Sequence, residues 1–206
     1  MTSAYQESTE NGHHIAKVEN SDTLSELSST GSDSTTEEQG FKNWRIQLSS
    51  VLNQIRKAKN LEELVQLTTA VVKEKIQSDR VMIYRFNSSS SGVVLGESIA
   101  NGWTPAMGET IPTMIFGLDA REEYLEAVSI NDIKEVELTA YKAQILEKFQ
   151  VTASLSIPIF VKDTVWGLLG IQNCVTAREW EAREISLISQ VSPEISHKLE
   201  SLELER

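Results

Sequence analysis

The sequence predicts an α+β domain, an antiparallel sheet with helices packed on one face. Three observations lead to this fold class. Apolar residues recur every three or four positions after residue 41 and again near the C-terminus, which is the spacing of amphipathic helices. Between these segments lie two pairs of runs rich in β-branched residues, and each pair is separated by a short polar turn. The resulting order (helix, helix, hairpin, loop with short helices, hairpin, helix) suits an antiparallel sheet covered by helices.

Residues 1–40 are predicted to be a disordered tail, and residues 41–206 one domain that includes both flanking helices. The tail is rich in Ser, Thr, Glu and Asn, so it cannot bury enough apolar surface to offset its ordering entropy. Eight acidic residues and one basic residue give it a net charge of −7, which leaves −4 of the total −11 for the rest of the chain. The segment is either an inert leader or a partner-binding tail that is phosphorylated in the cluster SSTGSDSTTEE.

Two helices are predicted at the start of the domain. The first begins at residue 41, where five apolar residues share one side of a helix: Phe41, Trp44, Leu48, Val51 and Ile55. The second begins after Asn60, which can accept a hydrogen bond as the N-cap. It carries Glu62 and Glu63 in its first turn, where the helix dipole favours acidic side chains. We expect this helix to end near Gln77.

The middle of the chain is predicted to change from helix to strand. Residues 79–86 alternate between two faces, and residues 93–101 return as the partner strand of a hairpin. Glycine and proline punctuate residues 102–117, which we interpret as a loop. Two short helices are expected after it, over residues 120–128 and 138–149.

A second hairpin is predicted from residues 151–161 and 164–175, joined by the dipeptide Lys162-Asp163. Pro158 lies inside the first of these strands. Because proline has no backbone N–H, we expect this residue at an edge, at a bulge or at an unpaired position of the sheet.

The last helix is predicted over residues 179–206. Its apolar positions form a near-heptad seam at Ile188, Ile195, Leu199 and Leu202. Pro193 interrupts this segment, so a kink or a break is expected near residues 189–192.

Several classes of function are disfavoured by the sequence. It contains no G-x-S-x-G, no Gly-rich phosphate loop and no H-E-x-x-H, so no enzyme is predicted. Cys174 is the only cysteine, and His13 and His14 lie in the tail, so no metal site is expected; His197 is interpreted as an exposed helix residue. The domain lacks the basic face that nucleic acid requires. No apolar run approaches the roughly 18–20 residues that span a bilayer, and no secretory signal is evident, so a cytoplasmic protein without membrane insertion is expected.

Several blocks of the sequence resemble the GAF domain of cyanobacteriochromes and phytochromes. These blocks are DRVMIYRFNSSSSGVVLGES, the tryptophan at 103, GETIP, ILEKFQVTASLSIPIF, WGLLGIQNC and REW, and the similarity covers roughly residues 45–200. The resemblance implies an antiparallel sheet of about six strands flanked by helices. It also implies a light-sensing input module, because the cyanobacteriochrome branch binds a linear tetrapyrrole through a thioether.

The attachment motif of that family departs from its usual form in this chain. The family pattern L-T-x-C-H-x-x-L-L-E-x-F is matched by LTAYKAQILEKF, residues 138–149, so Tyr141 stands at the thiol position and Lys142 at the imidazole position. A phenol with a pKa of about 10 does not replace a thiolate nucleophile. A lysine cannot reproduce the packing of the histidine under the pyrrole rings. The resemblance therefore implies a domain without a covalent bilin.

Other positions of the family's pocket also differ. The loop motif Asp-x-Cys-Phe is matched by Thr113 to Phe116, where only the phenylalanine is kept, and Gln172 takes the place of a histidine. Cys174 matches a scaffold cysteine rather than an attachment site. Together with a tryptophan in the long loop, these positions form our candidate pocket lining: Trp103, Thr113, Ile115, Phe116, Tyr141, Lys142 and Gln172.

The favoured function is a non-catalytic signalling or interaction module, a degenerate relative of photoreceptor domains that acts through a partner or an output domain. The related photoreceptors imply a homodimer through the flanking helices Phe41–Ile55 and Ile185–Leu202. Alternatively, the first apolar stripe simply covers its own sheet. A second hypothesis is a small-ligand sensor that holds a non-covalent bilin or a cyclic nucleotide, with Lys142 meeting a propionate or phosphate. An enzyme of unrecognised type rests only on the general versatility of folds.

Overall fold

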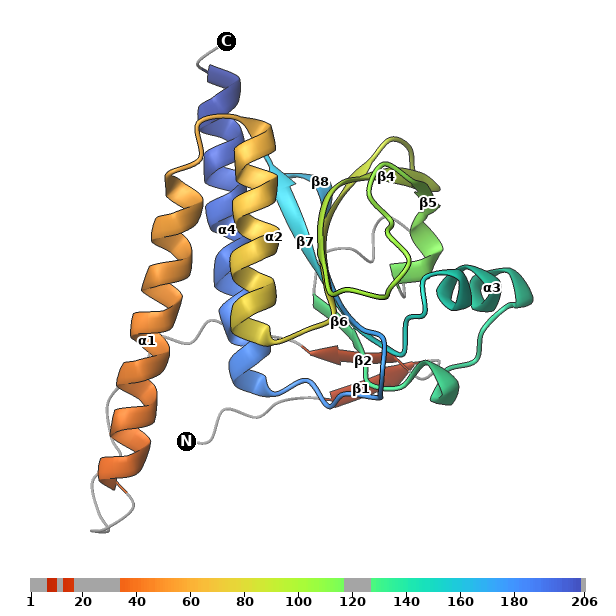
Figure 1. Cartoon of the computed structure of the whole chain (residues 1–206), viewed down its shortest axis with the longest axis horizontal. Coiled ribbons are helices and arrows are strands. Elements are labelled where there is room, and N and C mark those ends of the chain that lie inside the picture. The colour runs from red at the N-terminus through yellow and green to blue at the C-terminus, as the bar shows by residue number, and fades with distance from the viewer. Residues whose placement is uncertain (1–6, 11–12, 17–33, 117–126, 205–206) are drawn as a thin grey trace.

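The computed structural model describes the backbone of residues 7–10, 13–16, 34–116 and 127–204, and the side chains of residue 43 and of residues 45–116 and 127–202. A layer of three helices covers one face of a sheet, and a short helix lies on the other side (Figure 1). The layer consists of α1 (Ser34–Arg56), α2 (Leu61–Ile76) and α4 (Ala182–Leu204), and the short helix is α3 (Ala140–Lys148).

The sheet has the strand order β1-β2-β6-β7-β8-β3-β4-β5, and each neighbouring pair is antiparallel. Its strands are β1 (Glu7–Glu10), β2 (His13–Ala16), β3 (Arg80–Phe86), β4 (Ser91–Ile99), β5 (Thr110–Pro112), β6 (Ala127–Ile130), β7 (Ala153–Val161) and β8 (Thr164–Asn173). Six of the strands lie between residues 80 and 173, as the resemblance implied, and β1 and β2 pair onto the edge at β6. The predicted α+β class with an antiparallel sheet is confirmed.

Alternation along the strands separates two apolar cores. On β3, Val81 and Ile83 face the helices, whereas Met82 and Tyr84 face the opposite side. The helix-side core combines these residues with the inner sides of α1, α2 and α4. The core on the opposite side, here called the second-face core, consists of Met82, Tyr84, Val94, Ala106, Ile111, Ile115, Phe116, Val128, Leu146, Phe149, Val151, Val165 and Leu168.

The apolar stripes of the flanking helices are used inside the chain. Leu48, Val51 and Ile55 of α1 are buried in the helix-side core. The α4 seam is buried in the same core, through Ile188, Ile195 and Leu199 with Leu202 half-buried beside them. The burial of these residues therefore fits the alternative in which the apolar stripe of α1 covers its own domain. The side chains of Phe41 and Trp44 lie outside the described part of the chain.

The ends of α2 follow from local chemistry, as predicted. The Asn60 side chain accepts a hydrogen bond from the backbone N–H of Glu63 at 2.9 Å, which satisfies one of the free donors of the first turn. Gln77 ends the helix in the left-handed conformation, with φ of 54°, and its N–H bonds to the Lys73 carbonyl.

Arg178, in the connection between β8 and α4, joins three elements. Its guanidinium donates to the Ile76 carbonyl at the end of α2 and to the Asn173 side chain at the end of β8. It also pairs with Glu184 in the first turn of α4 and lies 4.8 Å from the centre of the Trp180 ring. The ends of α2, β8 and α4 are therefore held together by one side chain.

Pro158 occupies a position of the kind that the sequence predicted. In β7 the pairing with β6 covers only Ser154 to Ser156, so Pro158 lies beyond it and, among the strands that the structure describes, is paired with β8 alone. Its carbonyl accepts a hydrogen bond from the Ser192 hydroxyl of α4. The missing N–H therefore costs the sheet no ladder bond on that side.

Three of the predicted helix and strand assignments need correction. Helix α1 begins at Ser34 rather than Phe41, because residues such as Glu37 and Glu38 favour helix although they carry no apolar stripe. The helix expected over residues 120–128 lies mostly outside the described residues, and its last two positions open strand β6 instead. The loop expected over residues 102–117 contains β5 and a turn of 3-10 helix, η1 (Thr113–Phe116).

The last helix was also expected to be interrupted, but it does not break. Helix α4 continues through Pro193. That residue is exposed, so the missing backbone bond falls on the solvent side, while Val191 and Ser192 on the inner side stay packed. Among the described helices, none is long and apolar enough to cross a bilayer.

Candidate functional site

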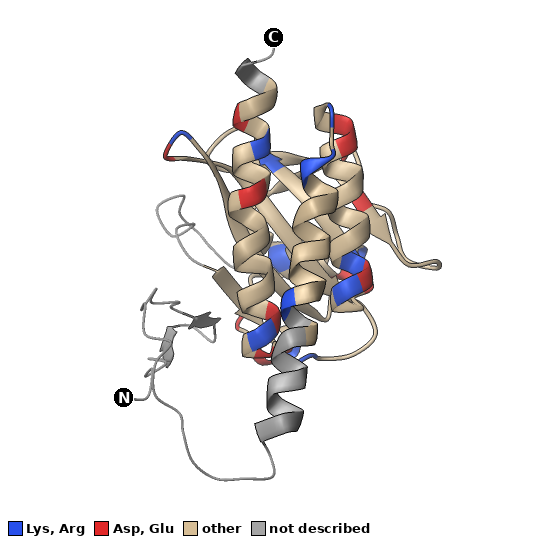
Figure 2. Cartoon of the chain, turned by 90° about the vertical axis from the view of Figure 1, so that its left-hand side faces the viewer, with Lys and Arg blue, Asp and Glu red and all other residues tan. Residues whose placement is uncertain are grey.

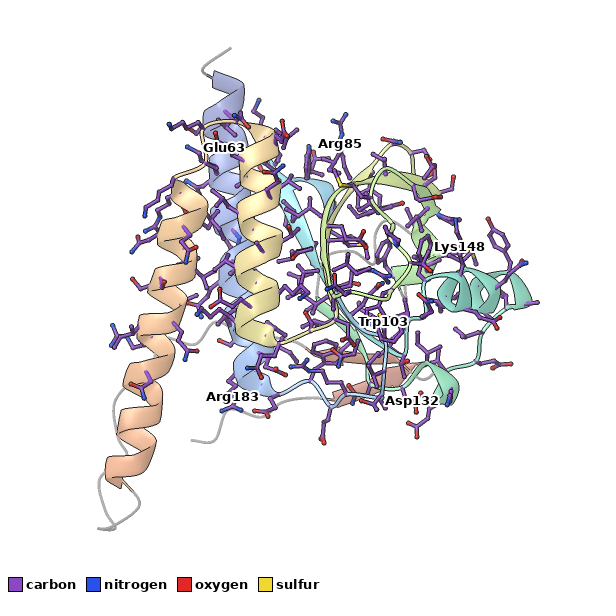
Figure 3. The ribbon with its side chains drawn as sticks, viewed as in Figure 1. Glu63, Arg85, Trp103, Asp132, Lys148 and Arg183 are labelled. Carbon is purple, nitrogen blue, oxygen red and sulfur yellow. The ribbon has the colours of Figure 1, made fainter. Side chains whose placement is uncertain are left out.

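The candidate site is the second face of the sheet, where α3, η1 and the loop of residues 100–109 cover the second-face core. Figure 3 shows the labelled Trp103 and Lys148 on this side, whereas Glu63 and Arg183 lie on the side of the helix layer. Six of the seven candidate pocket residues are buried or half-buried here, and Tyr141 is exposed.

Arg80, the first residue of β3, lies on this face, and its side chain is completely buried. Its guanidinium donates to three acceptors: the Phe149 carbonyl at 2.9 Å, the Gln172 side chain at 2.8 Å and the Thr104 carbonyl at 2.6 Å. A fourth contact is an ion pair with Glu97. Arg80 thus connects β3 to β4, β8, the end of α3 and the long loop.

Glu97 completes this arrangement from β4. One carboxylate oxygen lies 2.7 Å from Arg80 Nε. The other oxygen accepts hydrogen bonds from the backbone N–H groups of Ala106 and Met107, at 2.9 and 3.2 Å. Because a buried charge must be paired and hydrogen-bonded, the two side chains and the loop backbone stabilise one another.

The loop that carries Trp103 is held by two hydrogen bonds of the next residue, Thr104. The Thr104 carbonyl accepts from Arg80, and the Thr104 N–H donates to the Gln150 side chain at 3.0 Å. Gln150 itself has φ of 54°, a conformation that few side chains adopt. Trp103 is half-buried, so its indole is positioned by this anchored backbone.

Thr113, Ile115 and Phe116 lie together in η1 and are all buried. Phe116 packs on Tyr84, with ring centres 4.6 Å apart, and the Tyr84 hydroxyl donates to the Ile111 carbonyl at 2.6 Å. The Thr113 hydroxyl donates to the Ser89 carbonyl. These three candidates are therefore parts of the second-face core and its rim.

Tyr141 and Lys142 are separated by the geometry of α3. Thr139 caps the helix by accepting from the Lys142 N–H, so both residues lie in its first turn. Successive helix residues point in different directions, and Tyr141 is 55% exposed whereas Lys142 is 5% exposed. Of the two side chains, only that of the lysine is buried.

Gln172 and Cys174 lie on or just after β8 and differ in role. Gln172 is buried and its side-chain oxygen accepts from Arg80. Cys174 is buried too, and burial raises the pKa of its thiol to about 11, with the Asp79 and Glu97 carboxylates acting in the same direction and Arg80 opposing them. A thiol that stays protonated is a poor nucleophile, which agrees with its interpretation as a scaffold cysteine.

The sequence analysis missed Arg80, Glu97 and Gln150. A charged residue at the start of a strand is usually exposed, so nothing in the local pattern marks Arg80 and Glu97 as a buried pair. Arg80 and Glu97 can be recognised as a pair only when the register of the β3–β4 hairpin is known. No cluster of three or more metal-ligating side chains occurs among the residues that the structure describes.

A family model described as "GAF domain" matches residues 60–199. A protein of Synechocystis named as a methyl-accepting chemotaxis protein is 31% identical over 159 residues, which is 76% of this chain but 16% of that protein.

Two solved structures are similar in fold and sequence. The PixJ GAF domain of Thermosynechococcus elongatus in its blue-light absorbing form has a TM-score of 0.65 and 28% identity, over 71% of this chain and 92% of that one. The phycocyanobilin-bound GAF domain of a cyanobacterial phytochrome has a TM-score of 0.68 and 26% identity, over 79% and 97%.

Proposed function

The chain belongs to the GAF domain family, and we propose that it is a non-catalytic signalling module, a degenerate relative of cyanobacterial photoreceptor domains, that carries no covalent bilin. The observation that carries this proposal is Tyr141. In the resemblance it takes the position of the attachment thiol, and its side chain is exposed on α3. A phenol at this position offers no thiolate for a thioether bond.

The test is the colour of the protein when it is made in bilin-producing cells. We expect no pigment to remain on the chain after denaturation in acid urea. Pigment that stays bonded, and that peptide mapping places on any residue, contradicts the proposal. The variant Tyr141→Cys/Lys142→His, which restores the two motif residues, is the matched control for bilin supply and handling.

Such a module needs a partner or an output domain to pass on its state. The chain spans 16% of the length of the chemotaxis relative, so that relative contains much more than the matched region. We propose that this chain acts in the cytoplasm, through a signalling protein and as a homodimer formed by its flanking helices. Sedimentation across a range of concentrations tests the homodimer.

A second candidate function is a sensor that binds a small anionic or planar ligand without a covalent bond. The observation that favours it is Lys142, a lysine buried in the first turn of α3, one turn before Leu146 of the second-face core. Thermal-shift titration with bilins and cyclic nucleotides tests this candidate. A shift that is lost in Lys142→Met but kept in Lys148→Met would support it, and no shift with any of these ligands would contradict it.

A further inference from the structure

The outer edge of β6 is covered by the two strands at the start of the chain. Strand β2 pairs with β6 in antiparallel register, with residues 14–16 opposite residues 129–127. Strand β1 pairs in turn with β2, so the two strands lie side by side at the end of the sheet (Figure 1). The cover of this edge therefore comes from a segment that precedes the three-helix layer in the sequence.

Both faces of the sheet are covered, which leaves its edges for binding an extended polypeptide. Figure 2, viewed from the side of the helix layer, shows α1, α2 and α4 in front of the strands. On the other face, residues of α3, η1 and the loop of residues 100–109 pack in the second-face core. A strand at an edge presents unpaired backbone N–H and C=O groups, and another extended chain binds there by continuing the ladder.

Strand β6 is held firmly from its inner side. Residues 128–130 pair with β7, and the Trp180 indole N–H donates to the Ile130 carbonyl at 3.3 Å. Val128 belongs to the second-face core, whereas Ala127 belongs to the helix-side core. A chain that occupies the outer edge therefore lies next to a fixed strand that contributes to both cores.

The covering segment has the sequence of a hairpin that depends on its neighbour. Two residues, Asn11 and Gly12, connect β1 to β2. Asn-Gly is among the dipeptides most favoured in two-residue hairpin turns. A hairpin of two strands is at best marginally stable alone in water, so this one needs the edge of β6 for its stability. A cover of this kind binds the edge and is still exchangeable.

We propose that the outer edge of β6 is a binding site for an extended segment of a partner protein, and that residues 7–16 cover this site until the partner replaces them. The partner segment pairs antiparallel with residues 127–129 through backbone hydrogen bonds. The chain's own occupant has isoleucine opposite Val128 and alanine opposite Ala127, so the partner is expected to offer an apolar residue followed by a small one. Residues 17–33 tether the cover to α1, which favours the chain's own hairpin over that of a second copy. This surface contains no part of α1 or α4, so the inference does not depend on the proposed homodimer.

Cross-strand cysteines test whether the cover lies on this edge within one chain. In a Cys174→Ala background, His14→Cys/Ser129→Cys places two thiols at opposite positions, where Cα atoms about 4.5–5.5 Å apart suit a disulfide. We expect this pair to oxidise rapidly within one chain. Thr9→Cys/Ser129→Cys is the matched control, because position 9 is one strand further out, about 10 Å away and beyond the reach of a disulfide. Failure of the first pair to oxidise, equal oxidation of both pairs, or a bond between two chains would overturn the proposed cover.

Peptide titration tests the binding site itself. The probe is a fluorescent peptide with the sequence of residues 11–18, NGHHIAKV, added to the full chain. His14→Pro/Ile15→Pro releases the cover, because adjacent strand residues direct their N–H groups to opposite sides and one proline therefore removes a bond to β6. We expect this variant to bind the probe at least about tenfold more tightly than the wild type, because the tethered competitor is gone. The oxidised His14→Cys/Ser129→Cys chain should bind it more weakly than the wild type, and Ser25→Pro, outside β1 and β2, should bind like the wild type. Equal binding by the released and the oxidised chains, or no binding by the released chain, would overturn the proposal.

Discussion

Arg80 and Glu97 form an ion pair between diagonal neighbours on β3 and β4, and neither side chain is more than 2% exposed. The register places Glu97 opposite Met82, so the pair lies on the second face of the sheet, among apolar side chains. Each partner also holds the loop that carries Trp103. A fully buried pair that fixes a loop over a sheet face is the main polar element of the candidate site.

Arg80→Met is expected to lower the free energy of unfolding by about 3–5 kcal/mol, because it leaves Glu97 charged and buried without its partner. Urea denaturation followed by circular dichroism measures this loss. The control is Lys148→Met, which removes an ion pair with Glu109 whose side chains are about half exposed, and it should cost no more than about 1 kcal/mol. Equal effects of the two variants would contradict the structural role of the buried pair.

Gln77→Gly is expected to stabilise the protein by about 0.5–1 kcal/mol. Gln77 has a positive φ at the end of α2, where glycine is free of the steric cost of a Cβ, and its side chain is exposed. Thermal unfolding should show the gain as a higher Tm. Gln77→Ala keeps the Cβ and should leave the Tm nearly unchanged, so a similar gain in both variants would contradict the assigned backbone conformation.

Cys174 should resist alkylation at pH 8 in the native protein and react quickly once the chain is unfolded in urea. Its thiol pKa of about 11 lies above the ordinary value of about 8.5. Stability from this preference for the protonated thiol is fully present below the ordinary value and is lost as the pH rises toward 11. Mass spectrometry after iodoacetamide treatment measures the reaction. In a Val175→Cys variant the neighbouring exposed thiol should react at once, and rapid native labelling of Cys174 would show that it is accessible.

Ser192→Ala is expected to cost about 1–3 kcal/mol, because the Pro158 carbonyl then loses its donor in a buried position. Ser196→Ala is the matched control. Its hydroxyl donates only to the Ser192 carbonyl one turn earlier in the same helix, so a much smaller change in urea midpoint is expected. If the two variants are equally stable, the hydrogen bond from Ser192 to the Pro158 carbonyl contributes nothing to stability.

The elements with strong local signals were predictable from the sequence. The N-cap Asn60 and an apolar side located the second helix, and alternation of apolar residues located β3. In both cases the signal lies in the spacing of neighbouring residues in the sequence. The start of α1 was predicted too late in the sequence, and β6 was not predicted. A polar helix end has no apolar period, and a strand of four residues is too short to show one.

The site was predictable only in part. Thr113, Ile115, Phe116 and Lys142 are buried and Tyr141 is exposed, and the assignment of these residues to a pocket stays a prediction. Arg80 and Glu97 are separated by 16 positions and meet only through the pairing of β3 with β4. Contacts of this kind depend on the strand register, which a single sequence does not contain.

Arg178 is shared by three elements of the domain. Its guanidinium gathers the last carbonyls of one helix, a side chain from a sheet strand and a carboxylate from the next helix onto one planar group. A planar guanidinium presents its N–H donors at fixed angles, so one side chain can satisfy acceptors from several elements at once. Replacement of this one side chain would therefore remove contacts of α2, β8 and α4 at the same time.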